Sequence, residues 1–163
     1  MGDCSFSTIQ LLPPKKMVGK SLEMSFAQNK TVDLWRSFMP HRQAITNEAS
    51  KNFYSIQLYP PSFFTNFNPT TLFTKWACVE VNNFDIVPAG MQTLQLDGGL
   101  YTIFNYKGNS SNVPAAFTYI FQQWLPASKY VLDHRPHFEI LGPDYQNNDP
   151  DSQEQIFIPI QDK

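Results

Sequence analysis

The sequence predicts a single α+β domain built from two similar β–α–β–β halves, with antiparallel sheets and one main helix in each half. The chain has 163 residues, which suffices for one domain with a sizeable core and is short for two. A strand, helix, strand, strand order runs through about residues 1–86 and then starts again over residues 87–163. One such unit leaves part of its sheet uncovered, so we expect the halves to pack as a pseudo-twofold pair with a cleft between them.

The first half begins with a strand that contains a kink or bulge. Apolar residues alternate through residues 9–26, and Pro13-Pro14 interrupts them because proline donates no hydrogen bond to a ladder. We expect Thr31 to cap a helix, followed by strands over residues 54–59 and 73–81. The apolar face of the helix is expected to hold Val32, Trp35 and Met39, with Leu34 and Phe38 beside them.

The second half repeats this order. Residues 94–106 predict a strand pair or one long bent strand, with Gly98-Gly99 permitting the bend. After a loop over 107–113, a helix is expected to begin at Pro114 and to stop at Pro126. Its apolar residues fall at helical spacing: Phe117, Ile120, Phe121, Trp124 and Leu125. The last two strands are expected over residues 137–141 and 154–160, separated by a polar turn over 142–152.

Each predicted helix carries a tryptophan near its end and then a proline. The pairs are Trp35 with Pro40 and Trp124 with Pro126. Because residue identity between the halves is otherwise weak, the repeat is expected in structure rather than in sequence.

Composition argues against several functional classes. The formal net charge is −2 and no basic stripe is present, so direct nucleic-acid binding is not expected. No secretory leader and no stretch of membrane-spanning length is visible, which predicts a cytoplasmic protein with no membrane partner. Aromatic residues make up 15% of the chain, enough to line a cavity as well as a core.

Neither cysteines nor histidines indicate a metal or cofactor. Cys4 and Cys78 are far apart and match no zinc spacing, so we expect two free thiols. His134 and His137 lie three residues apart in an extended segment, where their side chains do not converge as they would on a helix. No cofactor is therefore expected.

The sequence resembles the GyrI-like family of small-molecule-binding domains, which includes effector-binding domains of AraC-type and multidrug-sensing bacterial regulators. The resemblance covers nearly the whole chain and is carried by the order and spacing of loose motifs. In the second half they are Gly99-Leu100-Tyr101-Thr102-Ile103-Phe104, Trp124-Leu125-Pro126, Arg135-Pro136-His137-Phe138-Glu139-Ile140-Leu141 and Ile156-Phe157-Ile158-Pro159-Ile160. In the first half they are Asp33-Leu34-Trp35, Tyr54-Ser55-Ile56-Gln57 and Trp76-Ala77-Cys78-Val79-Glu80-Val81. The regulators carry a helix-turn-helix domain before this module, and we expect the present chain to be a stand-alone member without one.

The resemblance implies a glutamate deep in an aromatic cleft, which maps to Glu139. Residue chemistry alone leaves two options, because Glu139 is either a cleft carboxylate or a solvent-facing residue paired with Arg135 or Lys129. Glu80 is a second candidate for a buried carboxylate or an edge charge, whereas Glu154 is expected to be a strand-end charge. The aromatic residues expected to line the cleft are Trp76, Tyr54, Tyr101, Phe104 and Phe117.

Three functions remain open from the sequence. The first is binding of a bulky, largely apolar, possibly cationic small molecule by a sensor, a sequestering protein or an accessory protein. The second, implied by the resemblance to free-standing family members, is hydrolysis of strained electrophilic small molecules, with Glu139 as general base or charge stabiliser and Tyr101 or Trp76 as orienting partner. The third is a gyrase-inhibitor-like protein-interaction module. The sequence does not predict an oligomeric state.

Overall fold

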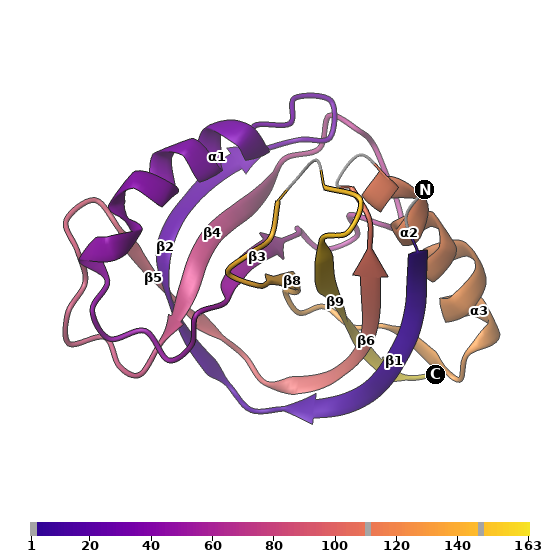
Figure 1. Ribbon diagram of the computed structural model, residues 1–163. Helices are drawn as coiled ribbons and strands as arrows, with labels where there is room; N and C mark the ends of the chain where they lie inside the picture. The colour runs from indigo at the N-terminus through magenta and orange to yellow at the C-terminus, as the bar shows by residue number, and fades with distance from the viewer. Residues whose placement is uncertain (1–2, 110–111, 147–148) are drawn as a thin grey trace.

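The computed structural model describes residues 3–109, 112–146 and 149–163 (Figure 1). Its main element is a curled antiparallel sheet with the strand order β1-β6-β9-β8-β3-β4-β2-β5, and β7 pairs with β9. The strands are β1 (Asp3–Leu12), β2 (Lys15–Met24), β3 (Phe53–Leu58), β4 (Phe73–Val81), β5 (Gln92–Leu96), β6 (Gly99–Lys107), β7 (Tyr130–Leu132), β8 (His137–Leu141) and β9 (Gln153–Asp162). The helical elements are α1 (Thr31–Phe38), η1 (Met39–Ala44), α2 (Val113–Tyr119), η3 (Ile120–Trp124) and α3 (Leu125–Ala127).

The predicted α+β class with antiparallel strands is confirmed, and the strand order is symmetric between the halves. Exchanging β1 with β5, β2 with β6, β3 with β8 and β4 with β9 turns the order into its own reverse. The halves meet where β3 pairs with β8, which we call the seam. This symmetry supports the interpretation of the chain as a duplicated β–α–β–β unit.

Each half opens with a long strand that bends, as the sequence predicts. Pro13-Pro14 separates β1 from β2, and β1 has a register shift between Phe6 and Thr8 where it pairs with β6. In the other half Gly99 has φ +152°, and a Cβ there would lie 2.5 Å from the guanidinium of Arg135. Only glycine fits this second bend without strain.

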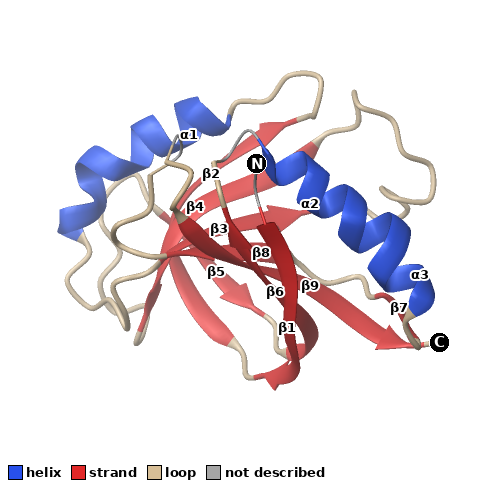
Figure 2. Ribbon diagram, turned by 45° about the vertical axis from the view of Figure 1, so that its right-hand side comes forward, coloured by secondary structure: helices blue, strands red, loops and turns tan. Residues whose placement is uncertain are grey.

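The sheet has two buried faces. The helix face carries Ala77, Ser55 and Glu139 in one cross-strand row, and α1 and α2–α3 both pack on this face, one over each half (Figure 2). The opposite face, called the inner face here, holds a separate apolar cluster that includes Ile56 and Phe138. The central strands β3 and β8 therefore carry polar residues on the helix face and apolar residues on the inner face.

Helix α1 differs from the prediction at its start and on its buried face. Lys30, not Thr31, is the N-cap residue, and Thr31 is the first helical residue, with its hydroxyl donating to Asn29 Oδ1 at 2.6 Å. Leu34 and Phe38 are buried and Trp35 packs beside them. The other two residues expected on the buried face are exposed because α1 turns its Leu34–Phe38 side toward the sheet: Val32 and Met39.

The second helical segment continues past the proline that was expected to stop it. A π-helical turn, η3, follows α2, and α3 then runs through Pro126 to Ala127. Proline is tolerated here because it lies in the first turn of α3, where a missing backbone N–H costs little. Strand β7 was not predicted. The expected loop 107–113 and turn 142–152 each include residues that lie outside the described parts of the chain: 110–111 and 147–148.

Candidate functional site

Buried polar side chains gather on the helix face of the seam, between the two helices. Strand register places Lys75, Gln57 and His137 in one cross-strand row and Ser55 and Glu139 in the next. Glu154 lies on the same face of β9, because it is two residues before Ile156, the partner of Glu139. We call this group the seam cluster: Ser55, Gln57, Lys75, His137, Glu139 and Glu154.

Glu139 is one of two buried acids in the cluster. Its side chain is 8% exposed, and its Oε1 accepts a hydrogen bond from Gln57 Nε2 at 3.3 Å. Its Oε2 is buried and has no hydrogen-bond partner within the described parts of the chain. Burial raises the pKa of the Glu139 carboxyl to about 7, although Lys75 and Gln57 act in the opposite direction. A buried carboxylate oxygen left unpaired is costly.

Glu154 is a second buried acid, not the strand-end charge that the sequence suggested. It is 7% exposed, and the phenol of Tyr145 lies close enough to its carboxyl to influence its pKa. Burial and the neighbouring charge of Glu139 raise the pKa of Glu154 to about 8. The correction has a structural cause, since the chain between β8 and β9 brings Tyr145 over the end of the strand and shields the carboxyl from water.

Lys75 supplies positive charge to the cluster without closing an ion pair. Its ammonium group donates a hydrogen bond to Thr31 Oγ1 at 3.1 Å. Burial lowers the pKa of Lys75, while attraction to Glu139 and Glu154 opposes that decrease. Among the described residues no ion pair joins Lys75 to either acid. Lys75 therefore offsets their charge only from a distance.

Aromatic rings cover the cluster at His137. The rings of Tyr59 and Phe64, from the segment after β3, lie 4.9 and 5.3 Å from the imidazole, and Phe121 of η3 lies 6.2 Å from it. Phe64 also stacks on Phe121 at 5.1 Å and so connects the first half to the second. Burial lowers the pKa of His137 to about 3, which keeps the imidazole neutral. On the side of His137 the surroundings of Glu139 are thus aromatic and uncharged, whereas Lys75 and Glu154 are its titratable neighbours on other strands.

Four of the residues expected near Glu139 lie on the opposite side of the sheet. Tyr54, Trp76 and Tyr101 belong to the apolar cluster of the inner face. Glu80 shares that face, where it accepts a hydrogen bond from the Tyr54 hydroxyl at 3.4 Å and lies 3.6 Å from Lys15 Nζ. They do not share a surface with Glu139, because successive strand residues point to opposite faces.

Phe104 and Phe117 lie on the helix face under α2. Phe104 is fully buried in the core beneath that helix. Phe117 is half-buried and stacks on Phe121 at 6.3 Å, so it reaches the aromatic cover only through that ring. The two partners proposed for a solvent-facing Glu139 lie elsewhere: Arg135 stacks on Tyr101 and binds Asp133, and Lys129 lies over Tyr130.

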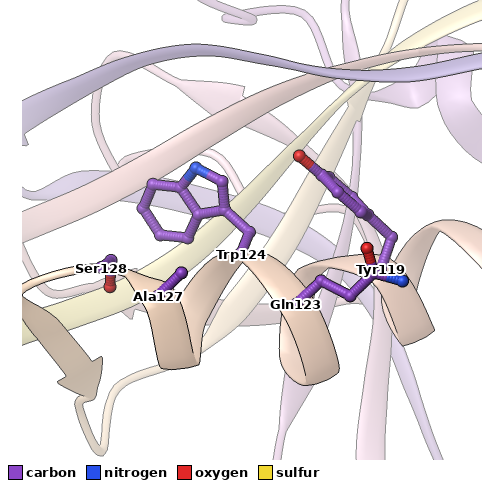
Figure 3. Close-up of a pocket in the computed structure, with 5 residues that line it drawn as sticks. All are labelled: Tyr119, Gln123, Trp124, Ala127 and Ser128. Carbon is purple, nitrogen blue, oxygen red and sulfur yellow. The ribbon is translucent and has the colours of Figure 1, made fainter.

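A separate shallow depression lies on the flank of α2–α3 (Figure 3). It has a volume of about 410 Å³ and is lined by Tyr119, Gln123, Trp124, Ala127 and Ser128. The rings of Tyr119 and Trp124 project from the same side of the helix, and Trp124 stacks on Phe6 at 5.4 Å. No charged side chain lines this depression, in contrast to the seam cluster.

Five residues in or beside the seam cluster are not among the site residues expected from the sequence: Lys75, Gln57, Tyr59, Phe64 and Tyr145. Strand alternation does place Gln57 and Tyr59 on the same side as Ser55, but the sequence does not show that this side is buried beside Glu139. No local signal identifies Phe64 or Tyr145, because both reach the cluster from segments between strands. No helix in the described parts of the chain is long and apolar enough to cross a membrane.

Comparison with solved structures shows the same fold in proteins of low sequence identity. The C-terminal domain of EcmrR has a TM-score of 0.72 and 14% identity, with 97% of this chain and 99% of that chain covered. The protein SAV2435, solved bound to tetraphenylphosphonium, has a TM-score of 0.68 and 15% identity over 96% and 93%. An integron cassette protein from the mobile metagenome of Vibrio cholerae has a TM-score of 0.66 and 16% identity over 98% and 99%.

Family comparison covers almost the whole chain. No curated protein sequence matches it significantly. The pattern of the GyrI-like small molecule binding domain, however, matches residues 6–161. The fold, with its antiparallel sheet and two helical segments, agrees with the structures above. The chain therefore belongs to the GyrI-like small-molecule-binding domain family.

Proposed function

We propose that this protein binds a bulky, largely apolar small molecule carrying a positive charge, and that Glu139 recognises that charge. The observation that supports this most strongly is the unpaired, buried Oε2 of Glu139, close to the aromatic rings that pack on His137. A cation would give this oxygen the partner it lacks, and the rings of Tyr59 and Phe121 would contact the apolar part of the ligand once Phe64 has moved aside. That one relative was solved with tetraphenylphosphonium is consistent with this ligand class.

The rings of Tyr59, Phe64 and Phe121, called the aromatic cover here, must move before a ligand can reach Glu139. Phe64 and Tyr59 pack on His137, two residues from Glu139 on the same strand face. Both rings belong to the chain between β3 and β4, which has a positive φ of 64° at Ser62. We expect this segment, rather than the sheet, to move when the ligand enters, because the sheet strands are paired on both sides at the seam.

The proposal is tested by calorimetric titration of tetraphenylphosphonium into wild type and Glu139→Gln across pH 5.5–8.5. The substitution keeps the shape and removes the charge, so it should weaken binding by about 2–5 kcal/mol. Wild-type affinity should fall as the pH decreases through about 7, where Glu139 takes up its proton. Glu80→Gln is the matched control, because Glu80 lies on the inner face. Equal, pH-independent affinity in all three proteins would exclude Glu139 as the recognising group.

Hydrolysis of strained electrophilic small molecules is the second candidate function. It is favoured by two carboxyls with pKa raised to about 7 and about 8, values suited to general acid–base work near neutral pH. Glu154 and its partner Tyr145 would then assist Glu139, because Tyr101 and Trp76 lie on the other face. Multiple turnover of an electrophilic cyclopropane substrate that is lost in Glu139→Gln would establish it, and a stoichiometric change at most would exclude it.

A further inference from the structure

The seam cluster holds more acid than base. Glu139 and Glu154 are its two carboxyls, and Lys75 is its one base that can be charged, since His137 is kept neutral by burial. With both acids ionised, the described part of the cluster would carry one net negative charge in a buried place. Neither acid has an ion-pair partner among the described residues. An empty site in this state would be electrostatically costly.

Strand register places the two carboxyls within reach of each other. Glu139 of β8 lies opposite Ile156 of β9, and Glu154 lies two residues earlier on the same face of that strand. Diagonal neighbours of this kind have Cβ atoms about 7 Å apart. Two carboxylates this close in a buried place interact strongly, so they titrate as a pair.

We infer that a cationic ligand enters the seam cluster in exchange for protons: the Glu139–Glu154 pair holds protons while the site is empty, and both carboxyls ionise when the cation arrives. This inference rests on the proposed function and assigns Glu154 a role in it. Without ligand, bound protons neutralise the carboxyls. When the cation binds, its positive charge takes over this role and the protons leave. Affinity and selectivity for charged over neutral ligands would then both depend on pH.

The groups around the pair agree with this exchange. Burial raises the pKa of Glu139 to about 7, and burial together with the charge of Glu139 raises that of Glu154 to about 8. Lys75 faces the pair from β4 and favours ionisation of both acids. The neighbouring hydroxyls stay protonated in this range, because burial raises the pKa of each phenol: Tyr59 after β3, Tyr145 between β8 and β9, and Tyr106 on β6. The carboxyls are therefore the groups that release protons near neutral pH.

Calorimetry in buffers of different ionisation enthalpy measures the exchange directly. Tetraphenylphosphonium is titrated at pH 7 into the full chain in phosphate and in imidazole. The slope of the observed binding enthalpy against the ionisation enthalpy of the buffer gives the number of protons released. We expect release of roughly one proton per bound cation at pH 7, decreasing toward zero as the pH rises above both pKa values. Triphenylphosphine oxide, a neutral probe of similar shape, should release none.

Two variants assign the protons to the pair. Glu154→Gln should still bind the cation but release less than half as many protons, because one of the two acids is gone. Glu23→Gln, at an exposed glutamate of β2, should release as many as wild type. Binding of the cation without proton release at any pH from 6 to 9, or full release by Glu154→Gln, would overturn the exchange but leave the proposed function intact. Absence of binding at every pH would overturn both.

Discussion

Because the pKa of Glu139 is raised in the folded protein, the unfolding free energy, like ligand binding, should depend on pH. The carboxyl has a pKa of about 7 in the folded protein against an ordinary value of 4.5. The folded state therefore holds this proton more tightly than the unfolded state does. Its contribution to stability is fully present below pH 4.5 and is lost as the pH rises through about 7. The difference between the two values corresponds to about 3 kcal/mol of unfolding free energy.

Glu139→Gln removes this titration while keeping a neutral side chain of the same shape. We expect the unfolding free energy of wild type to lose about 3 kcal/mol more than that of the variant between pH 4.5 and pH 8. Urea denaturation of both proteins at several pH values, followed by tryptophan fluorescence, measures the difference. Glu154 remains in both proteins, but its pKa is raised less in the variant because the charge of Glu139 is absent, so the wild-type loss also includes the coupling between the two carboxyls. If the unfolding free energies of wild type and variant change in parallel with pH, the carboxyl at position 139 is not buried with a raised pKa.

Two further predictions concern the thiols and the aromatic cover. Cys78 is fully buried whereas Cys4 is half-buried, so dithionitrobenzoate should modify Cys4 well before Cys78 in the native protein, and both at once after unfolding. Equal native rates would contradict the placement of Cys78 in the core. Phe64→Ala removes the ring that packs on His137 and Phe121, so it should bind tetraphenylphosphonium more tightly and cost about 2 kcal/mol of stability. Phe67→Ala, at an exposed ring of the same segment, is its control, and weaker binding by Phe64→Ala would mean that the ring contacts the ligand instead of blocking it.

Local patterns determined which residues share a strand face. Alternation alone places His137 with Glu139, and Trp76 with Glu80, and the structure keeps both groupings. The same holds for β4 and β8, whose observed bounds agree with the predicted ones. These results depend only on the two-residue period of a strand, which neighbouring residues fix by themselves.

The tertiary structure alone decided which face the helices cover and where the buried acids gather. The helices of both halves cover the face of Glu139, whereas the bent strands bring Tyr54 and Tyr101 together on the other side. No sequence period records which face a distant helix will cover, because that depends on how the halves pack. For the same reason Glu154 looked like a terminal charge. Only folding brings Tyr145 and Lys75 close to it, and burial then raises the pKa of an ordinary carboxyl.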